Sequence, residues 1–198
     1  MTSKLLLSIL AAVPAVLMPI AVSCQVAPDR APAQPTGPVY RYDASVGIGY
    51  TSLNQVNQSR SGLLGVSGSV TRYFGDHFGI TADGGHYAWS VTSSNTGNPT
   101  VDLFMAGPVV KANLYEKFSG FAHGMLGGAH TGNIAISPNV SFAGGFGAGI
   151  DYQMKPRISL RFYGDDIGSS FTLSPFQPGF SPHMRWNART GLSVVYKF

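Results

Sequence analysis

The sequence predicts an all-β protein, an eight-stranded antiparallel up-and-down transmembrane β-barrel, from three observations. Charged residues make up only 11% of the 198-residue chain, against about 25% in a typical soluble domain. Segments of alternating apolar and polar residues recur along the chain, and the connections between them alternate between short and long. The final segment, 184–198, has one apolar face with aromatic residues at both of its ends. A strand that crosses a bilayer has this pattern.

Residues 1–23 have the features of a secretory signal peptide. Lys4 precedes an apolar run at 5–20, and the small residues at 21–23 offer a cleavage position. The run is short for a transmembrane helix, and two prolines interrupt it, so a retained membrane anchor is disfavoured.

Cys24 would be the first residue of the mature protein, and it is the only cysteine in the chain, which excludes an intramolecular disulfide. Residues 21–24 resemble a weak lipobox, so lipidation of Cys24 is one alternative and ordinary cleavage that leaves a free thiol is the other. Residues 24–39 carry four prolines and little to bury, which predicts a disordered tail. The barrel domain is therefore expected at 40–198.

Eight strands follow in order along the barrel domain. Their predicted ranges are 40–53, 62–74, 77–91, 100–113, 118–131, 140–153, 156–168 and 184–198. Short turns near 75–76, 115–117 and 154–156 alternate with longer connections at 54–61, 92–99, 132–139 and 169–183. This alternation is typical of an outer-membrane barrel with both termini on the periplasmic side, and it is not expected of a Greek-key sandwich.

Alternation also assigns most residues to the lipid-facing or the interior face. In the first strand, for example, Val46 and Ile48 share the apolar face. The segments 103–106 and 121–125 sort poorly, because residues 103–106 are apolar on both faces and residues 121–125 can be read with either face inward. Pro108 falls inside a predicted strand although proline cannot donate to the ladder, so we expect a β-bulge at this position.

The polar faces place charged residues inside the barrel. The interior of an eight-stranded barrel is only wide enough for side chains to fill it, and an unpaired buried charge is costly. We expect Arg161, Arg189 and Asp165 to belong to one network, because the seventh and eighth strands are neighbours. The predicted interior charge set is Asp43, Asp83, Asp151, Arg161, Asp165, Arg189 and Lys197. A structural role is the first interpretation of this set, and a gate or a narrow ion path is the alternative.

Three segments, 146–152 (FGAGIDY), 155–161 (KPRISLR) and 191–198 (GLSVVYKF), resemble the OmpA-like family of small outer-membrane β-barrels, in the form that carries no further globular domain. The resemblance implies an integral outer-membrane protein in contact with lipid and lipopolysaccharide. It also implies the outer-membrane assembly machinery as a partner, with a signal formed by Val194, Tyr196 and Phe198. The resemblance is specific for the architecture and does not indicate the biological role.

The sequence favours a structural or surface-interaction role in which the four longer connections contact surface ligands, and a narrow porin-like channel for small solutes or ions is the alternative. A lipid-modifying barrel enzyme is less favoured, since none of the five histidines is followed by serine two residues later. No catalytic residue, cofactor or metal ligand is predicted, because His86, His123 and His130 lack ligand-like spacing. The net charge of +4 comes from scattered basic residues, which disfavours a nucleic-acid partner.

Overall fold

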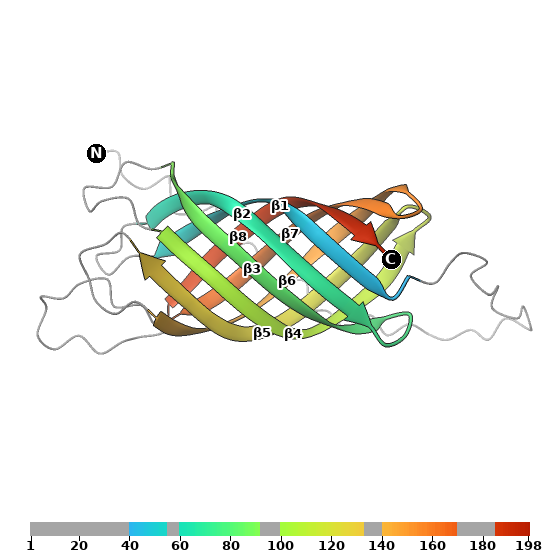
Figure 1. Ribbon diagram of the computed structural model, residues 1–198, viewed down its shortest axis with the longest axis horizontal. Coiled ribbons are helices and arrows are strands. Elements are labelled where there is room, and N and C mark those ends of the chain that lie inside the picture. The colour runs from blue at the N-terminus through green and yellow to red at the C-terminus, as the bar shows by residue number, and fades with distance from the viewer. Residues whose placement is uncertain (1–39, 55–59, 92–99, 133–139, 170–184) are drawn as a thin grey trace, which may run out of the picture. The chain divides into compact units, whose positions relative to one another are not determined.

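The computed structural model describes residues 40–54, 60–91, 100–132, 140–169 and 185–198. The predicted signal peptide, the predicted tail with Cys24 and most of the four longer connections lie outside these residues. The described chain forms eight antiparallel strands that close into a barrel (Figure 1), which confirms the predicted fold class.

The strands follow the chain in order around the barrel, and β8 pairs with β1 to close it. Their bounds are β1 Tyr42–Asn54, β2 Arg60–Tyr73, β3 Phe78–Ser90, β4 Thr100–Tyr115, β5 Phe118–Gly132, β6 Val140–Lys155, β7 Ile158–Ser169 and β8 Arg185–Lys197. Every predicted strand corresponds to one of these, because the period-2 alternation and the turn residues mark the ends of each segment.

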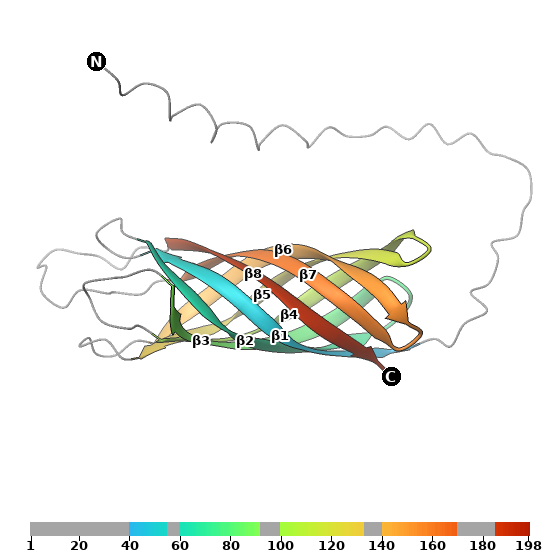
Figure 2. The ribbon, with the colours of Figure 1, turned by 90° about the horizontal axis from the view of Figure 1, so that it is seen from above.

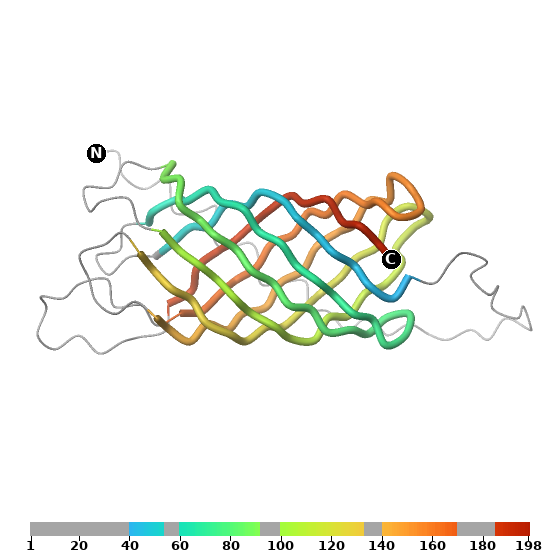
Figure 3. Tube along the Cα trace, in the orientation of Figure 1, coloured from blue at the N-terminus to red at the C-terminus, as the bar shows by residue number. Residues whose placement is uncertain are grey.

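The two ends of the barrel differ in their connections. Residues 74–77, 116–117 and 156–157 join β2–β3, β4–β5 and β6–β7 at the end where β1 begins and β8 ends (Figures 1 and 2). We call this the turn end, and we call the opposite end the loop end. Figure 3 shows the strands inclined to the long axis of the barrel, as closure of an eight-stranded sheet requires.

The seam between β1 and β8 runs from the pair Asp43–Lys197 to the pair Ser52–Ala188. At its turn end, the Tyr42 amide donates to the Phe198 carbonyl (3.0 Å) and the Phe198 amide donates to the Tyr42 carbonyl (2.9 Å). The rings of these two residues also stack, with centroids 5.5 Å apart. The last residue of the chain is thus part of the closure.

The two faces of the sheet have different compositions. In β8, Asn187 and Arg189 are buried in the lumen, while Leu192 and Val194 are exposed on the outer wall. Aromatic residues ring the turn end of this wall, and we call them the turn-end girdle: Tyr42, Phe74, Phe78, Tyr115, Phe118, Tyr152, Tyr196 and Phe198. An apolar wall bounded by rings is the surface that a membrane-spanning barrel presents to lipid.

The expected bulge at Pro108 is wrong. The register between β4 and β5 is the same on both sides of Pro108, and around this position the ladder omits only Gly107 and Pro108. The sheet therefore tolerates a proline by losing pairing locally, without an inserted residue. Register shifts occur instead at Leu64/Gly65 and at two positions next to the hairpin turns.

In the described part of the chain, no helix is long and apolar enough to cross a membrane.

Candidate functional site in the barrel lumen

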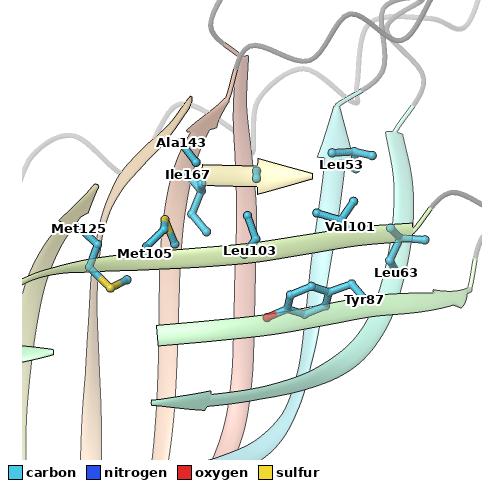
Figure 4. Packing of buried hydrophobic residues seen from close by; sticks show 10 residues of the cluster. Leu53, Leu63, Tyr87, Val101, Leu103, Met105, Met125, Ala143 and Ile167 are labelled. Atoms are coloured by element: carbon cyan, nitrogen blue, oxygen red, sulfur yellow. The ribbon is translucent and has the colours of Figure 1, made fainter. Parts of the chain in front are cut away.

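Apolar side chains fill the loop-end half of the lumen (Figure 4). We call this group the apolar plug; it contains Leu53, Leu63, Tyr87, Val101, Leu103, Met105, Met125, Ala129, Ala143 and Ile167. Tyr87, Leu63 and Met105 have no exposed surface. The plug explains why the sequence of β4 and β5 failed to sort: Leu103 and Met105 face an apolar lumen while Phe104 faces outward, so both faces are apolar.

Ionic groups fill the turn-end half, where a first cluster joins β1, β4, β6 and β7. Arg161 donates two hydrogen bonds to Asp151, from Nε (2.7 Å) and from a terminal nitrogen (3.0 Å). Lys111 Nζ lies 3.0 Å from Asp151 and 3.3 Å from Asp43. The Tyr73 hydroxyl also donates to Asp43 (3.3 Å). We call Asp43, Lys111, Asp151 and Arg161 the turn-end cluster.

A second cluster lies in the middle of the lumen and joins β3, β5, β7 and β8. Arg189 donates to Asp165 (2.6 Å) from Nε and to Asp83 (2.5 Å) from a terminal nitrogen. Nε2 of His123 lies 2.9 Å from the other carboxylate oxygen of Asp165. We call Asp83, His123, Asp165 and Arg189 the central cluster. Bidentate and shared carboxylates satisfy the buried charges, which would otherwise be costly.

The contacts do not place Arg161, Arg189 and Asp165 in one network as expected. Arg189 and Asp165 belong to the central cluster, while Arg161 belongs to the turn-end cluster. The reason is register: Asp151 lies directly opposite Arg161, and Asp165 lies directly opposite Arg189. Lys197 is on the lumen side of β8 and makes no ion pair within the described ranges.

A small polar cavity lies between the clusters. Its volume is about 30 Å³, and Ser45, Ser67, Thr71, Tyr163 and Ser193 are among the residues that line it. Ser67 and Tyr163 share a hydrogen bond of 2.7 Å across it. A cavity of this size holds on the order of one water molecule. The lumen therefore contains polar space, and Met125 of the plug is among the residues that border it.

No protein-family model matches this sequence, and no curated protein matches it. Solved structures do match. Neisserial surface protein A (NspA) is similar over 79% of this chain and 97% of its own, with 10% sequence identity and a TM-score of 0.63.

Two further structures give the same architecture. Ail, the attachment invasion locus protein of Yersinia pestis, matches over 80% of this chain and 99% of its own, with 15% identity and a TM-score of 0.52. The outer membrane protein OprG from Pseudomonas aeruginosa matches over 82% and 97%, with 10% identity and a TM-score of 0.51. At identities this low, the structural similarity shows that the fold is shared, and it shows nothing more specific than the fold.

Sequence reasoning missed two members of the clusters, Lys111 and His123. Both lie on the strands whose faces could not be assigned, so neither was placed in the interior. A signal for Lys111 was present, since it is the only charged residue on the lumen-facing side of β4. A lone cation on an otherwise apolar strand face needs a buried anionic partner, and the structure supplies two.

Two further histidines lie on the outer wall. His86 on β3 and His130 on β5 flank Asp102 on β4. Among the described residues, no group of three or more histidine, cysteine or acidic side chains is arranged to hold a metal ion.

Proposed function

We propose that the protein is an integral outer-membrane β-barrel with a structural or surface-interaction role and no catalytic activity. The observation that carries the proposal is a filled lumen inside an apolar outer wall. The wall provides the surface that lipid requires, and the turn-end girdle marks one water interface. The plug and the two clusters occupy the space through which a solute would pass.

The membrane placement is tested by gel mobility of protein taken from an outer-membrane fraction. We expect a compact, fast band in SDS without boiling, and a slower band after boiling, because a closed barrel resists SDS. A single unshifted band from the soluble periplasmic fraction would mean that the outer wall is an ordinary core surface, and the proposal would be lost.

The channel alternative is tested by conductance of the refolded barrel in planar bilayers. We expect no stable conductance steps at physiological salt, because apolar side chains of the plug occupy the loop-end half of the lumen. Stable steps would instead assign the protein to the narrow porin-like channels. Arg189→Ala should leave the bilayer silent yet lower the heat stability, and no change in stability would remove the structural role of the interior charges.

The orientation follows from the same proposal. Both ends of the barrel chain lie at the turn end, and we place that end in the periplasm. An epitope inserted in 92–99 should be detected on intact cells, whereas an epitope after Phe198 should require permeabilised cells. Detection of the second epitope on intact cells would reverse the orientation.

We also propose that the segments 54–61, 92–99, 132–139 and 169–183 contact surface ligands. Ail of Yersinia pestis has been solved in complex with the heparin analogue sucrose octasulfate, with 14% identity and a TM-score of 0.51. Sulfated glycans are therefore a reasonable first probe. Heparin binding by intact cells should fall when one segment is replaced by a glycine-serine sequence of equal length, and binding that survives all four replacements would contradict the proposal.

The last strand carries the proposed assembly signal. Val194, Tyr196 and Phe198 share the outer face of β8, with exposed fractions of 47%, 46% and 53%. The outer-membrane assembly machinery is the proposed partner, and lipid with lipopolysaccharide is the proposed surrounding. We also propose that this chain belongs to the OmpA-like family of small barrels, and the shared architecture supports this proposal.

A further inference from the structure

Three aromatic residues of the turn-end girdle form a continuous row across the barrel seam. The rings of Tyr196 and Phe198 on β8 stack with their centroids 6.1 Å apart, and the Phe198 ring stacks on Tyr42 at 5.5 Å. All three rings are exposed on the outer wall. We call Tyr42, Tyr196 and Phe198 the seam row. Stacked rings at the edge of an apolar wall give lipid a surface with an apolar body and polar hydroxyl groups.

Arg72 of β2 lies at one end of the seam row. Its guanidinium carbon is 5.9 Å from the centre of the Tyr42 ring and 5.3 Å from the centre of the Phe74 ring, so cation–π contacts hold it within the girdle. The side chain is exposed, and among the described residues it makes no ion pair. The N–H groups of this guanidinium are therefore available to an acceptor outside the protein.

Arg157, in the turn between β6 and β7, lies at the other end of the seam row. Its guanidinium carbon is 5.9 Å from the centre of the Tyr40 ring, and the side chains of Tyr40 and Tyr196 are its hydrogen-bond partners. Within the described ranges it too is exposed and has no acidic partner. Two tyrosine partners leave other N–H donors of this guanidinium free. Both arginines stay charged at any physiological pH, so no titration is needed to make them cationic.

The exposed charges around the turn end are mostly basic. With histidine neutral and the α-carboxylate of Phe198 counted, five basic groups exceed three acidic groups by two. A membrane surface of net negative charge attracts such an end. The exposed charged side chains at this end are Arg41, Arg72, Lys117, Lys155 and Arg157, with Asp76 and Glu116 as the acidic ones.

We propose that the seam row, with Arg72 and Arg157 at its ends, is a docking surface for anionic glycerophospholipids in the leaflet around the turn end. Each guanidinium donates paired hydrogen bonds to the phosphate of its own lipid, and the rings between them contact the glycerol and the upper acyl chains. A zwitterionic lipid brings its ammonium group near the same cations and is disfavoured. The inference rests on the membrane placement proposed above and adds the class of lipid that this surface selects.

The experiment uses the full mature chain refolded in dodecyl maltoside micelles, which contain no phosphate. Dioleoyl phosphatidylglycerol and dioleoyl phosphatidylcholine are titrated separately at neutral pH and low salt, and native mass spectrometry counts the lipids that the barrel retains. We expect phosphatidylglycerol to bind about fivefold or more tightly than phosphatidylcholine. Arg72→Gln combined with Arg157→Gln should remove this preference. The matched control, Lys117→Gln combined with Lys155→Gln, removes the same charge from two exposed lysines that make no cation–π contact among the described residues, and it should keep the preference.

Three results would overturn the assignment. Equal retention of the two lipids, or a preference that survives in the arginine variant, would show that these arginines select no lipid. An equal loss of preference in the lysine control would leave only the net charge of the turn end as the cause. Displacement of phosphatidylglycerol by an equal concentration of glycerol 3-phosphate would make the surface a site for soluble phosphates. Each titration uses protein whose unboiled band migrates fast in SDS, so a failure of the docking surface is distinguishable from a failure of the membrane placement.

Discussion

Arg161 and Asp151 face each other directly across β6 and β7 and are joined by two hydrogen bonds inside the lumen. The guanidinium also lies 4.4 Å from the centre of the Phe121 ring. This pair holds the turn-end cluster together, because Asp151 also accepts from Lys111, whose Nζ contacts Asp43 in turn. One cross-strand register position thus connects four strands through their side chains.

Replacing Arg161 with methionine should destabilise the barrel by about 3–5 kcal/mol, which is the usual cost of leaving the other partner of a buried ion pair as an uncompensated charge. Lys111 remains beside Asp151, which places the expected value near the lower limit. Urea unfolding of the protein in lipid vesicles measures the change. Lys155→Met, at an exposed position at the turn end of β6, is the matched control and should leave the unfolding midpoint in place.

Gly147 on β6 provides the space for the central cluster. A Cβ atom at this position would collide with Oδ1 of Asp165 and would lie 2.7 Å from Nε2 of His123. Gly147→Ala should therefore cost about 1–3 kcal/mol through overpacking. Gly124→Ala, on neighbouring β5, is the control, because a Cβ there meets nothing within 4 Å. Equal unfolding midpoints for the two variants would show that the central cluster can shift enough to accommodate an added methyl group.

Met105 belongs to the apolar plug and has no exposed surface. Met105→Ala should cost about 2–5 kcal/mol, because truncation loses buried apolar contacts and leaves a cavity. Met105→Leu conserves volume and should cost less than about 1.5 kcal/mol. Unfolding in vesicles again gives the values. A small loss of stability for Met105→Ala would mean that the plug is loosely packed.

Phe198 contributes both a ring and a backbone to the barrel seam. Phe198→Ala keeps the two backbone hydrogen bonds with Tyr42 and removes the stacked ring, so we expect a loss of about 1 kcal/mol in refolded protein. Deletion of Phe198 should cost more, because the backbone bonds are also lost. If the residue is in addition an assembly signal, Phe198→Ala should lower the outer-membrane yield in cells far more than this small stability loss explains.

The mature N-terminus is decided by mass spectrometry of protein purified from membranes. Cleavage before Cys24 with a free thiol gives the mass of residues 24–198. Lipidation of Cys24 adds the mass of its acyl chains and makes the protein partition with lipid even when the barrel is unfolded. A mass that includes residues 1–23 would contradict the predicted signal peptide.

The strands could be predicted because the residue pattern of each strand is present in its local sequence. The alternation of Val46 and Ile48 with glycine, and the turn at 75–76, each depend on neighbours in the sequence. The partners of the interior charges were not predictable in the same way. Arg189 and Asp83 are 106 residues apart and lie on β8 and β3, so only the closed barrel brings them together.

The face assignment failed where the lumen itself is apolar. The alternation rule assumes a polar interior, and Leu103 and Met105 violate that assumption because they belong to the apolar plug. His123 was missed for the same reason, since its strand could be read with either face inward. The contacts of Asp102 with His86 and His130 were not predicted, because the three residues are on three strands and have no distinctive local spacing.

The apolar plug has a consequence for the segments that connect the strands at the loop end. If the barrel proves silent in planar bilayers, as proposed, the plug residues on the strands carry the permeability barrier. Changes of length or sequence in the connecting segments should then leave that barrier intact. Such a barrel is a suitable frame on which to display foreign peptides, provided that the plug residues are kept.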